Sequence, residues 1–248
     1  MIIGIGVAQD QNPQKVITSI TALNGAAEVV CYTSADLSPS PLYRVARSDS
    51  PEWALIQDLR DGVIDAAVRG SLPAGATLGL LRTAMQVDHL ERIALLETVS
   101  GQKFLLAPVG VDEGWTIAQR VALVEEARKI AERFGLSSEV AVLSGGRYGD
   151  VGRHPIVDQS LAAGELVAKI GGAVHYEIRI EDAVESCGVV IAPDGIAGNL
   201  IFRTLSFLGG GKGHGAPVVN INKIFIDTSR ASPDYTNALL LAISMFDW

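Results

Sequence analysis

Apolar residues along this chain occur in short continuous runs, and stretches with helical spacing separate most of them. The runs are rich in Ile and Val and are apolar at successive positions, which is typical of parallel strands buried on both faces. The predicted strands are Ile2–Val7, Glu28–Tyr32, Ile64–Val68, Arg92–Leu96, Phe104–Val109, Val140–Leu143, Val189–Ala192 and Lys223–Ile226. This alternation predicts an α/β fold with mainly parallel, doubly wound sheets.

Helix starts are marked at several places by a capping side chain directly before a proline. These are Asn12-Pro13, Ser50-Pro51 and Ser232-Pro233. Proline fits the first helical position because its missing N–H has no partner there in any case. The clearest helix starts at Thr116 and ends near Gly135, with an apolar stripe of Ile117, Val121, Val124, Ala127, Ala131 and Phe134.

Two stretches look like crossings between domains. Ala107–Thr116 carries Pro, Gly and Asp directly after a strand, and Leu208–Pro217 carries a cluster of glycines. A chain that leaves one lobe at the first stretch and returns at the second forms two interleaved lobes. We therefore predict one lobe from residues 1–107 plus 216–248, a second from residues 108–215, and a ligand cleft between them.

The amino-acid composition limits which kinds of macromolecule or metal ion the protein is expected to bind. Lys and Arg total 20 and Asp and Glu total 28, for a formal net charge of −8, which argues against nucleic acid and against an anionic membrane surface. Cys31 and Cys187 are too few for a disulfide scaffold, and the four histidines lack metal-ligand spacing, so no metal site is expected. With no apolar run of about 18 residues and no signal peptide, we expect a soluble cytoplasmic protein.

Ligands of parallel sheets bind beyond the carboxyl ends of the strands, so the loops that follow strands are the candidate sites. In the loop Arg69–Thr77, small residues around Gly70 and the hydroxyls of Ser71 and Thr77 provide donors for an anion. The alternative is an ordinary turn in which Thr77 caps a helix that starts near Leu78.

The loop Ser144–His154 is rich in glycine and carries two arginines, of which Arg147 is the candidate phosphate ligand. Ordinary solvated arginines are the alternative. In the loop Ala192–Asn199, Asp194 ends a buried strand and suits a polar group of the site. Asn199 is either part of that site or the cap of a helix that starts at Leu200.

The last loop, Asp227–Thr236, leads into the C-terminal helix. Arg230 before a helix N-terminus would form a strong anion site, because a full positive charge adds to the helix dipole. Asp234 fits the role of a first-turn carboxylate better than that of a catalytic base.

Taken in order, these segments resemble the phosphate acetyl/butyryltransferase family. The similar segments are Gly62–Leu80, Val189–Asn199 with Pro193, Asp194, Gly198 and Asn199, Leu208–Pro217, and Asp227-x-Ser229-Arg230. The resemblance implies two α/β lobes of isocitrate/isopropylmalate dehydrogenase-like topology, a homodimer and an active site between the lobes. It also implies attack of coenzyme A on an acyl phosphate, with Ser229 and Arg230 as catalytic residues.

One position departs from this family. The aspartate that deprotonates the thiol in the family corresponds to Thr236, and a neutral hydroxyl is no substitute for a carboxylate base. This difference argues against ordinary acyl transfer.

The chain is most similar to a short branch of this superfamily, the methanogenesis marker protein 4 family, also called methyltransferase-related protein subunit X. The opening Ile3-Gly4-Ile5-Gly6, Asn12-Pro13-Lys15 and the segment Ile64–Leu72 carry this likeness. It implies a methyltransferase, or a subunit that works with other methyltransferase subunits on an anionic small molecule. Acyl transfer with coenzyme A and non-catalytic ligand binding remain alternatives.

Overall fold

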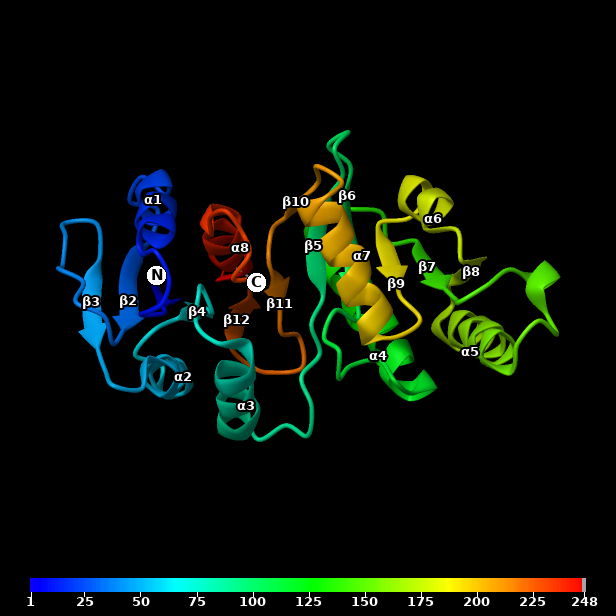
Figure 1. The fold of residues 1–248 in the computed structure, drawn as a ribbon, viewed down its shortest axis with the longest axis horizontal. Coiled ribbons are helices and arrows are strands. Elements are labelled where there is room, and N and C mark those ends of the chain that lie inside the picture. The colour runs from blue at the N-terminus through cyan, green and yellow to red at the C-terminus, as the bar shows by residue number, and fades with distance from the viewer. Residues whose placement is uncertain (247–248) are drawn as a thin grey trace. The chain divides into compact units, whose positions relative to one another are not determined.

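Two six-stranded mixed sheets organise the chain, one in each of two units (Figure 1). The computed structural model describes residues 1–246. The first unit comprises Met1–Leu90 and the chain from Gly215 onward, and the second comprises Glu91–His214. Parallel strands alternate with helices in both units, which confirms the predicted α/β fold.

The sheet of the first unit has the order β11-β12-β4-β1-β2-β3, and every neighbouring pair is parallel except β11 with β12. Its strands are β1 (Ile2–Val7), β2 (Glu28–Thr33), β3 (Arg44–Arg47), β4 (Ala66–Val68), β11 (Ala216–Pro217) and β12 (Ile224–Asp227). Its helices are α1 (Gln14–Ala22), α2 (Pro51–Asp61), α3 (Ala74–Met85) and α8 (Thr236–Phe246).

The direction of travel along this sheet determines which face each helix covers. The chain moves outward from β1 to β2 through α1 and returns to β4 through α2, so right-handed crossovers place α1 and α2 on opposite faces. On one face α2 packs against α3 around buried Leu55, Leu59, Leu81 and Phe225. On the other face α1 packs against α8.

The second unit is built on the same plan. Its sheet has the order β10-β5-β6-β9-β7-β8. The strands are β5 (Ala94–Glu97), β6 (Lys103–Ala107), β7 (Val140–Leu143), β8 (Val174–Glu177), β9 (Val189–Ile191) and β10 (Lys212–Gly213). The helices are α4 (Ile117–Arg133), α5 (Pro155–Gly171), α6 (Ile180–Ser186) and α7 (Gly195–Phe207), with a 3₁₀ turn at Tyr148–Asp150.

The predicted boundary at residue 107 differs from the structure, in which the second unit begins at Glu91. The reason is that β5 and β6 form an antiparallel hairpin, and β6 is also the parallel neighbour of β9. The hairpin therefore belongs to the second sheet, although its two apolar runs resemble the strands before them. The return to the first unit at Gly215 lies one residue from the predicted position.

The predicted helix starts differ in accuracy. Thr116 forms a capping box with Gln119 at the start of α4, as expected from a threonine before an apolar stripe. By contrast α8 starts at Thr236 rather than at Pro233, because the Asp234 carboxylate accepts the Thr236 N–H at 2.9 Å. Strands β3 and β8 were not predicted, because they lie at sheet edges and are only partly buried.

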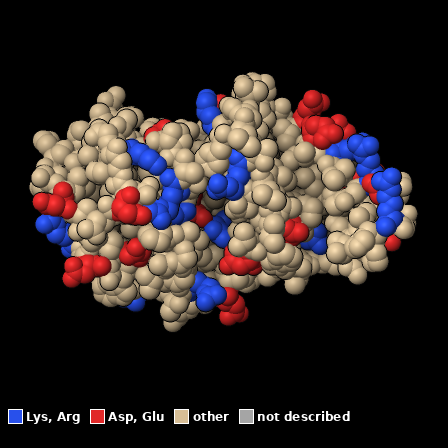
Figure 2. Space-filling model, in the orientation of Figure 1, with Lys and Arg blue, Asp and Glu red and all other residues tan. Residues whose placement is uncertain are grey.

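The surface in Figure 2 shows Lys and Arg in short clusters beside Asp and Glu, with no continuous basic area on that face. None of the helices in residues 1–246 is long and apolar enough to span a bilayer. In the same part of the chain, His, Cys, Asp and Glu form no group of three or more able to bind a metal ion.

Helix α7 approaches the loop after β6 closely, and two glycines make this contact possible. A Cβ on Gly195 would lie 1.5 Å from the Gly110 carbonyl oxygen, and a Cβ on Gly198 would lie 1.8 Å from that of Pro108. Both obstacles are backbone atoms, which cannot rotate away. Glycine is therefore required where this helix begins.

We expect Gly198→Ala to lower the free energy of unfolding by about 1–3 kcal/mol, as overpacking does elsewhere. Gly79→Ala in α3 is the matched control, since a Cβ there meets nothing within 4 Å. That control should be neutral or stabilise by about 0.5–1 kcal/mol. Urea denaturation measures both, and a Gly198→Ala protein as stable as the control would contradict the close contact.

Candidate functional site

Three neighbouring strands of the first unit end at one edge of its sheet. β12, β4 and β1 are adjacent and parallel, so their carboxyl ends lie together. The loops that leave them contain the predicted residues Gly70, Ser71, Ser229 and Arg230. This edge is therefore the candidate site of the unit.

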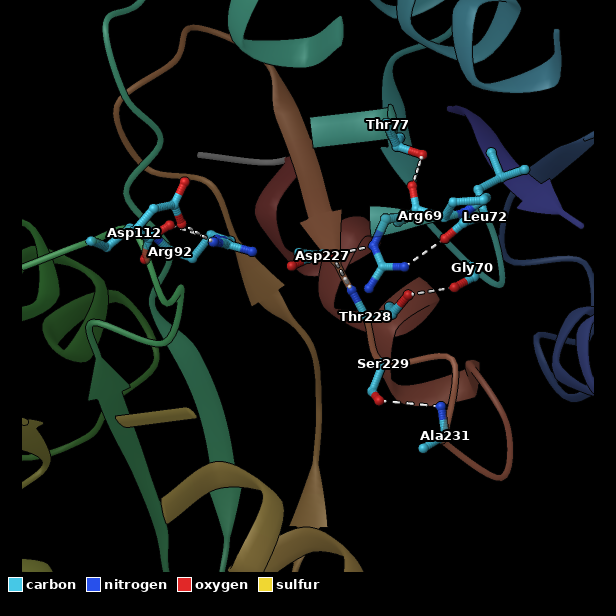
Figure 3. Close-up of polar contacts among 12 residues, drawn as sticks. Arg69, Gly70, Leu72, Thr77, Arg92, Asp112, Asp227, Thr228, Ser229 and Ala231 are labelled. Atoms are coloured by element: carbon cyan, nitrogen blue, oxygen red, sulfur yellow. Dashed lines mark hydrogen bonds and ion pairs between the residues drawn. The ribbon is translucent and has the colours of Figure 1, made fainter. Parts of the chain in front are cut away.

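A buried ion pair joins two of these loops. Arg69 Nε donates to the Asp227 carboxylate, and Arg69 Nη1 donates to the Leu72 carbonyl at 2.6 Å (Figure 3). The Arg69 side chain is 5% exposed and that of Asp227 is 12% exposed. The same Asp227 oxygen accepts the Thr228 N–H at 2.9 Å. The pair therefore determines how the chain leaves both β4 and β12.

Gly70 and Ser71 connect the same loops to β1 and β12. The Thr228 hydroxyl donates to the Gly70 carbonyl at 2.8 Å, as Figure 3 shows. Gly70 has φ +60°, and a Cβ there would lie 2.1 Å from the Gly6 carbonyl oxygen, so only glycine fits. Ser71 is buried, and its Oγ accepts the Ala8 N–H at 2.9 Å. In this structure both residues therefore make contacts that shape the edge.

Ser229 and Arg230 lie at the tip of the loop after β12. Ser229 is half-buried and its Oγ accepts the Ala231 N–H at 3.2 Å, which leaves its own proton available for donation (Figure 3). Arg230 Nη2 donates to both oxygens of Asp10, at 2.8 and 2.7 Å. These two side chains are 36% and 70% exposed. A guanidinium that contacts a solvent-exposed carboxylate can exchange it for another oxyanion.

Lys15 of α1 orders the backbone of this loop. Its ammonium donates to the carbonyls of Arg230, at 3.0 Å, and of Ser232, at 3.2 Å. Arg230 therefore extends from a backbone that is anchored on a neighbouring helix.

The start of α8 contains a buried phenol. Tyr235 is 2% exposed, and its hydroxyl has no hydrogen-bond partner among residues 1–246. Burial raises the pKa of Tyr235, while the charges of Arg69 and Arg230 oppose this shift. Thr236, the first residue of α8, is half-buried, and Asp234 is exposed and accepts its N–H. Asp234 precedes α8, so it is not the first-turn carboxylate that the sequence favoured, and its carboxylate instead accepts the N–H of the first helical residue.

Thr77, a further predicted residue, lies in the first turn of the helix that follows Arg69, Gly70 and Ser71. Thr77 is buried inside α3, where its hydroxyl donates to the Pro73 carbonyl at 2.8 Å. The alternative in which Thr77 caps a helix near Leu78 is wrong, because α3 already starts at Ala74.

Asp194, Asn199 and Arg147 belong to the second unit. Asp194 caps α7 by accepting the Ala197 N–H at 2.8 Å, so the helix starts at Gly195 and not at Leu200. Asn199 lies inside that helix and donates to the Val109 carbonyl at 2.9 Å, which excludes the capping role. Arg147 is exposed in the loop after β7, a strand adjacent and parallel to β9.

Sequence reasoning missed Arg69, Asp10 and Lys15. Arg69 directly follows a strand, where a charged residue on an otherwise apolar run could have marked it as a partner for Asp227. Asp10 and Lys15 lie in and after the loop that leaves β1. Nothing local to these two residues indicates that their partners are more than 200 positions away.

Removal of Arg69 tests the buried pair. We expect Arg69→Met to lower the free energy of unfolding by about 3–5 kcal/mol, because it leaves Asp227 charged and buried. Arg60→Met is the control, since Arg60 forms an ion pair with Asp61 on the surface, and its stability should hardly change. Chemical denaturation measures both variants. Equal, small effects would mean that the Arg69–Asp227 pair does not stabilise the edge.

Comparison with solved structures relates the fold to acyltransferases. A branched-chain phosphotransacylase from Enterococcus faecalis V583 matches with a TM-score of 0.73 at 17% identity, covering 99% of each chain. A phosphotransacetylase from Streptococcus pyogenes matches with a TM-score of 0.70 at 14% identity, covering 100% of this chain and 93% of that one. Isocitrate dehydrogenase from Methylococcus capsulatus matches at 0.58 and 12% identity, covering 99% of this chain and 84% of that one. These likenesses establish the fold.

Comparison of sequences establishes the family. No family model matches the chain. The protein named "Putative methyltransferase mtx subunit X" from Methanosarcina barkeri is 45% identical over 206 residues, covering 81% of this chain and 76% of its own length. Its namesake from Methanosarcina mazei is 44% identical, covering 81% and 74%. An uncharacterized methyltransferase of Methanopyrus kandleri is 39% identical over 229 residues, covering 88% of each. The chain therefore belongs to the methyltransferase mtx subunit X family, on a phosphotransacetylase-like fold.

Proposed function

We propose that this protein is a methyltransferase, or a subunit of one, that binds an anionic small molecule beside Ser229 and Arg230. Support for methyl transfer comes from the names of its relatives, which include methyltransferase subunit X proteins from two Methanosarcina species. The sources of these relatives also support a role in methane-producing metabolism. The word "subunit" in those names supports a further proposal, namely association with other subunits.

The contact between Arg230 and Asp10 is the observation that carries the anion-binding part of this proposal. A carboxylate already lies 2.7–2.8 Å from the guanidinium, so the geometry suits an oxyanion. Since the pair is exposed to water, its own stability is low and exchange for a ligand costs little. Asp10 is expected to move aside when a phosphate or carboxylate binds.

The neighbouring groups suit a transferase. The Ser229 hydroxyl can donate to a ligand oxygen, and the positive charge of Arg230 adjoins it in the chain. Together they would stabilise negative charge that develops on a reacting oxygen. Lys15 and the Arg69–Asp227 pair order the backbone, so these donors would be positioned before the ligand arrives.

Acyl transfer between an acyl phosphate and coenzyme A is the second candidate, favoured by the fold. It requires a base that removes the proton of the thiol. Thr236 stands at the relevant place, and its hydroxyl does not ionise near neutral pH. Asp234 is exposed and engaged with the Thr236 N–H. The residues at the start of α8 therefore do not fit this step, and coenzyme A binding remains a proposal for experiment.

A non-catalytic role is the third candidate, favoured by the same Thr236. Such a protein would bind the anion through Arg230 and respond to it without turnover. A homodimer is proposed in all three cases, from the phosphate acetyl/butyryltransferase resemblance. Light scattering after size-exclusion chromatography measures the mass in solution.

Replacement of Arg230 tests the anion site. We expect Arg230→Ala to weaken the binding of acetyl phosphate about tenfold or more, because hydrogen bonds to a charged group contribute about 1.5–3 kcal/mol. The fold should remain intact. Arg47→Ala removes a surface arginine that forms an ion pair with Asp36, and binding should be unchanged. Isothermal titration calorimetry measures acetyl phosphate binding by the unchanged protein and by both variants. An Arg230→Ala protein that binds acetyl phosphate as tightly as the unchanged protein would exclude Arg230 from the site.

Coenzyme A separates the first two candidates. The methyl-transfer proposal expects no saturable heat at millimolar coenzyme A, with or without phosphate. One-to-one binding would instead support acyl transfer. In that case Thr236→Asp should supply the missing base and produce measurable acetyl-coenzyme A from acetyl phosphate. A Thr236→Asn protein controls for the change in shape, because its amide cannot accept the proton.

A further inference from the structure

Arg120 is a buried cation in the second unit that forms no ion pair with any of residues 1–246. It lies in the first turn of α4 and is 5% exposed. Its Nε is buried and has no hydrogen-bond partner within residues 1–246. Burial lowers the pKa of Arg120, as expected for a cation removed from water. An unpaired buried guanidinium is costly, so a binding partner is to be expected.

Arg120 lies near the edge of its sheet where the carboxyl ends of β6 and β9 meet, the edge at which ligands of parallel sheets bind. Helix α4 packs against β6 and β9. The loop that leaves β6 leads directly into the first turn of α4, which contains Arg120. Asp194 leaves β9 at the same edge and attracts the Arg120 charge. Nevertheless, within the described chain no carboxylate oxygen lies within 4.0 Å of the Arg120 guanidinium.

Other polar groups of this edge are already engaged. Glu113 accepts hydrogen bonds from Arg92 Nε at 2.5 Å and from the Gly110 N–H at 3.0 Å, and it is 1% exposed. Asn199 donates to the Val109 carbonyl. Among residues 1–246, Asp194 is therefore the carboxylate that acts on the charge of Arg120.

Asp194 itself retains an unused acceptor. Its Oδ1 accepts the Ala197 N–H, and Oδ2 accepts no hydrogen bond from the described residues. Asp194 is half-buried and so reaches solvent. Arg120 thus provides hydrogen-bond donors for negatively charged oxygens, and Asp194 Oδ2 provides one hydrogen-bond acceptor.

We propose that Arg120 and Asp194 form a binding site for a small oxyanion that carries its own hydrogen-bond donor. The guanidinium donates to the negative oxygens, and the hydroxyl of the ligand donates to Asp194 Oδ2. Inorganic phosphate is the simplest such ligand, because it keeps a proton near neutral pH. Sulfate has the same shape and no proton, so its oxygens would face the Asp194 carboxylate without a hydrogen bond.

This site uses none of the residues of the Ser229–Arg230 loop and does not depend on the reaction proposed above. Titrations of phosphate and sulfate in the Arg230→Ala protein therefore isolate it. We expect saturable phosphate binding there, at least tenfold tighter than sulfate binding, in line with the strength of a charge-assisted hydrogen bond.

Three variants in the Arg230→Ala background test the assignment. Arg120→Gln should weaken phosphate binding about tenfold or more, since it removes a charged donor. Asp194→Asn should bring the phosphate-to-sulfate ratio close to one or below, while asparagine continues to cap α7. Lys129→Gln is the control, because Lys129 lies on the same helix and forms an ion pair with Glu126 on the surface. It should leave both affinities unchanged.

The proposal is overturned if Arg230→Ala does not bind phosphate, or if Arg120→Gln binds it as tightly. If Arg120→Gln does not fold, Asp194→Asn decides alone: an unchanged phosphate-to-sulfate ratio overturns the site. Phosphate binding that survives in Arg230→Ala and disappears in Arg120→Gln supports this site, whatever the fate of the methyl-transfer proposal.

Discussion

The buried ion pair between Arg69 and Asp227 is the interaction on which the candidate edge of the first unit depends. It connects the exits of two adjacent parallel strands that lie 158 positions apart in the chain. Because charges removed from water are costly unless they are paired, the two loops have one strongly preferred arrangement. Gly70, Ser71 and Thr228 then complete the hydrogen bonds of the same edge. Ser229 and Arg230 extend from this ordered base.

The second unit also contains a buried ion pair, and in addition it contains a buried arginine that forms no ion pair within residues 1–246. Arg92 and Glu113 form a buried pair there, and Glu113 also orders the loop after β6 through the Gly110 N–H. Gly195 and Gly198 let α7 approach that loop at backbone contact distance. Arg120 is a further buried cation, and it forms no ion pair with the described part of the chain. Buried Arg92 is paired and orders a loop, whereas the Arg120 Nε is a donor with no hydrogen-bond partner among residues 1–246.

The names of the relatives point to methyl transfer, whereas the fold is that of acyl-transferring enzymes. The residues at the start of α8 help to distinguish the two. The fold is shared with phosphotransacetylases, whereas the relatives in sequence carry methyltransferase names. Thr236 provides no base for a thiol, and the buried Tyr235 hydroxyl has its pKa raised by desolvation. One fold can carry different reactions, so the phosphotransacetylase-like fold and the methyltransferase names of the relatives are compatible.

The sequence by itself determined the α/β class, the positions of the central strands and the helix that starts at Thr116. These features depend on apolar runs and capping residues within a few positions of one another, which a single sequence displays directly. The motif Asp227-x-Ser229-Arg230 also marked the edge of the first sheet. The tertiary structure alone decided that Asp10 is the partner of Arg230 and that the β5–β6 hairpin joins the second sheet. It also decided that Arg120 is buried with no hydrogen-bond partner for its Nε among residues 1–246. Each of these outcomes depends on contacts between residues distant in the chain or on the burial of a charged group. Long-range contacts and burial of this kind leave no local pattern in the sequence.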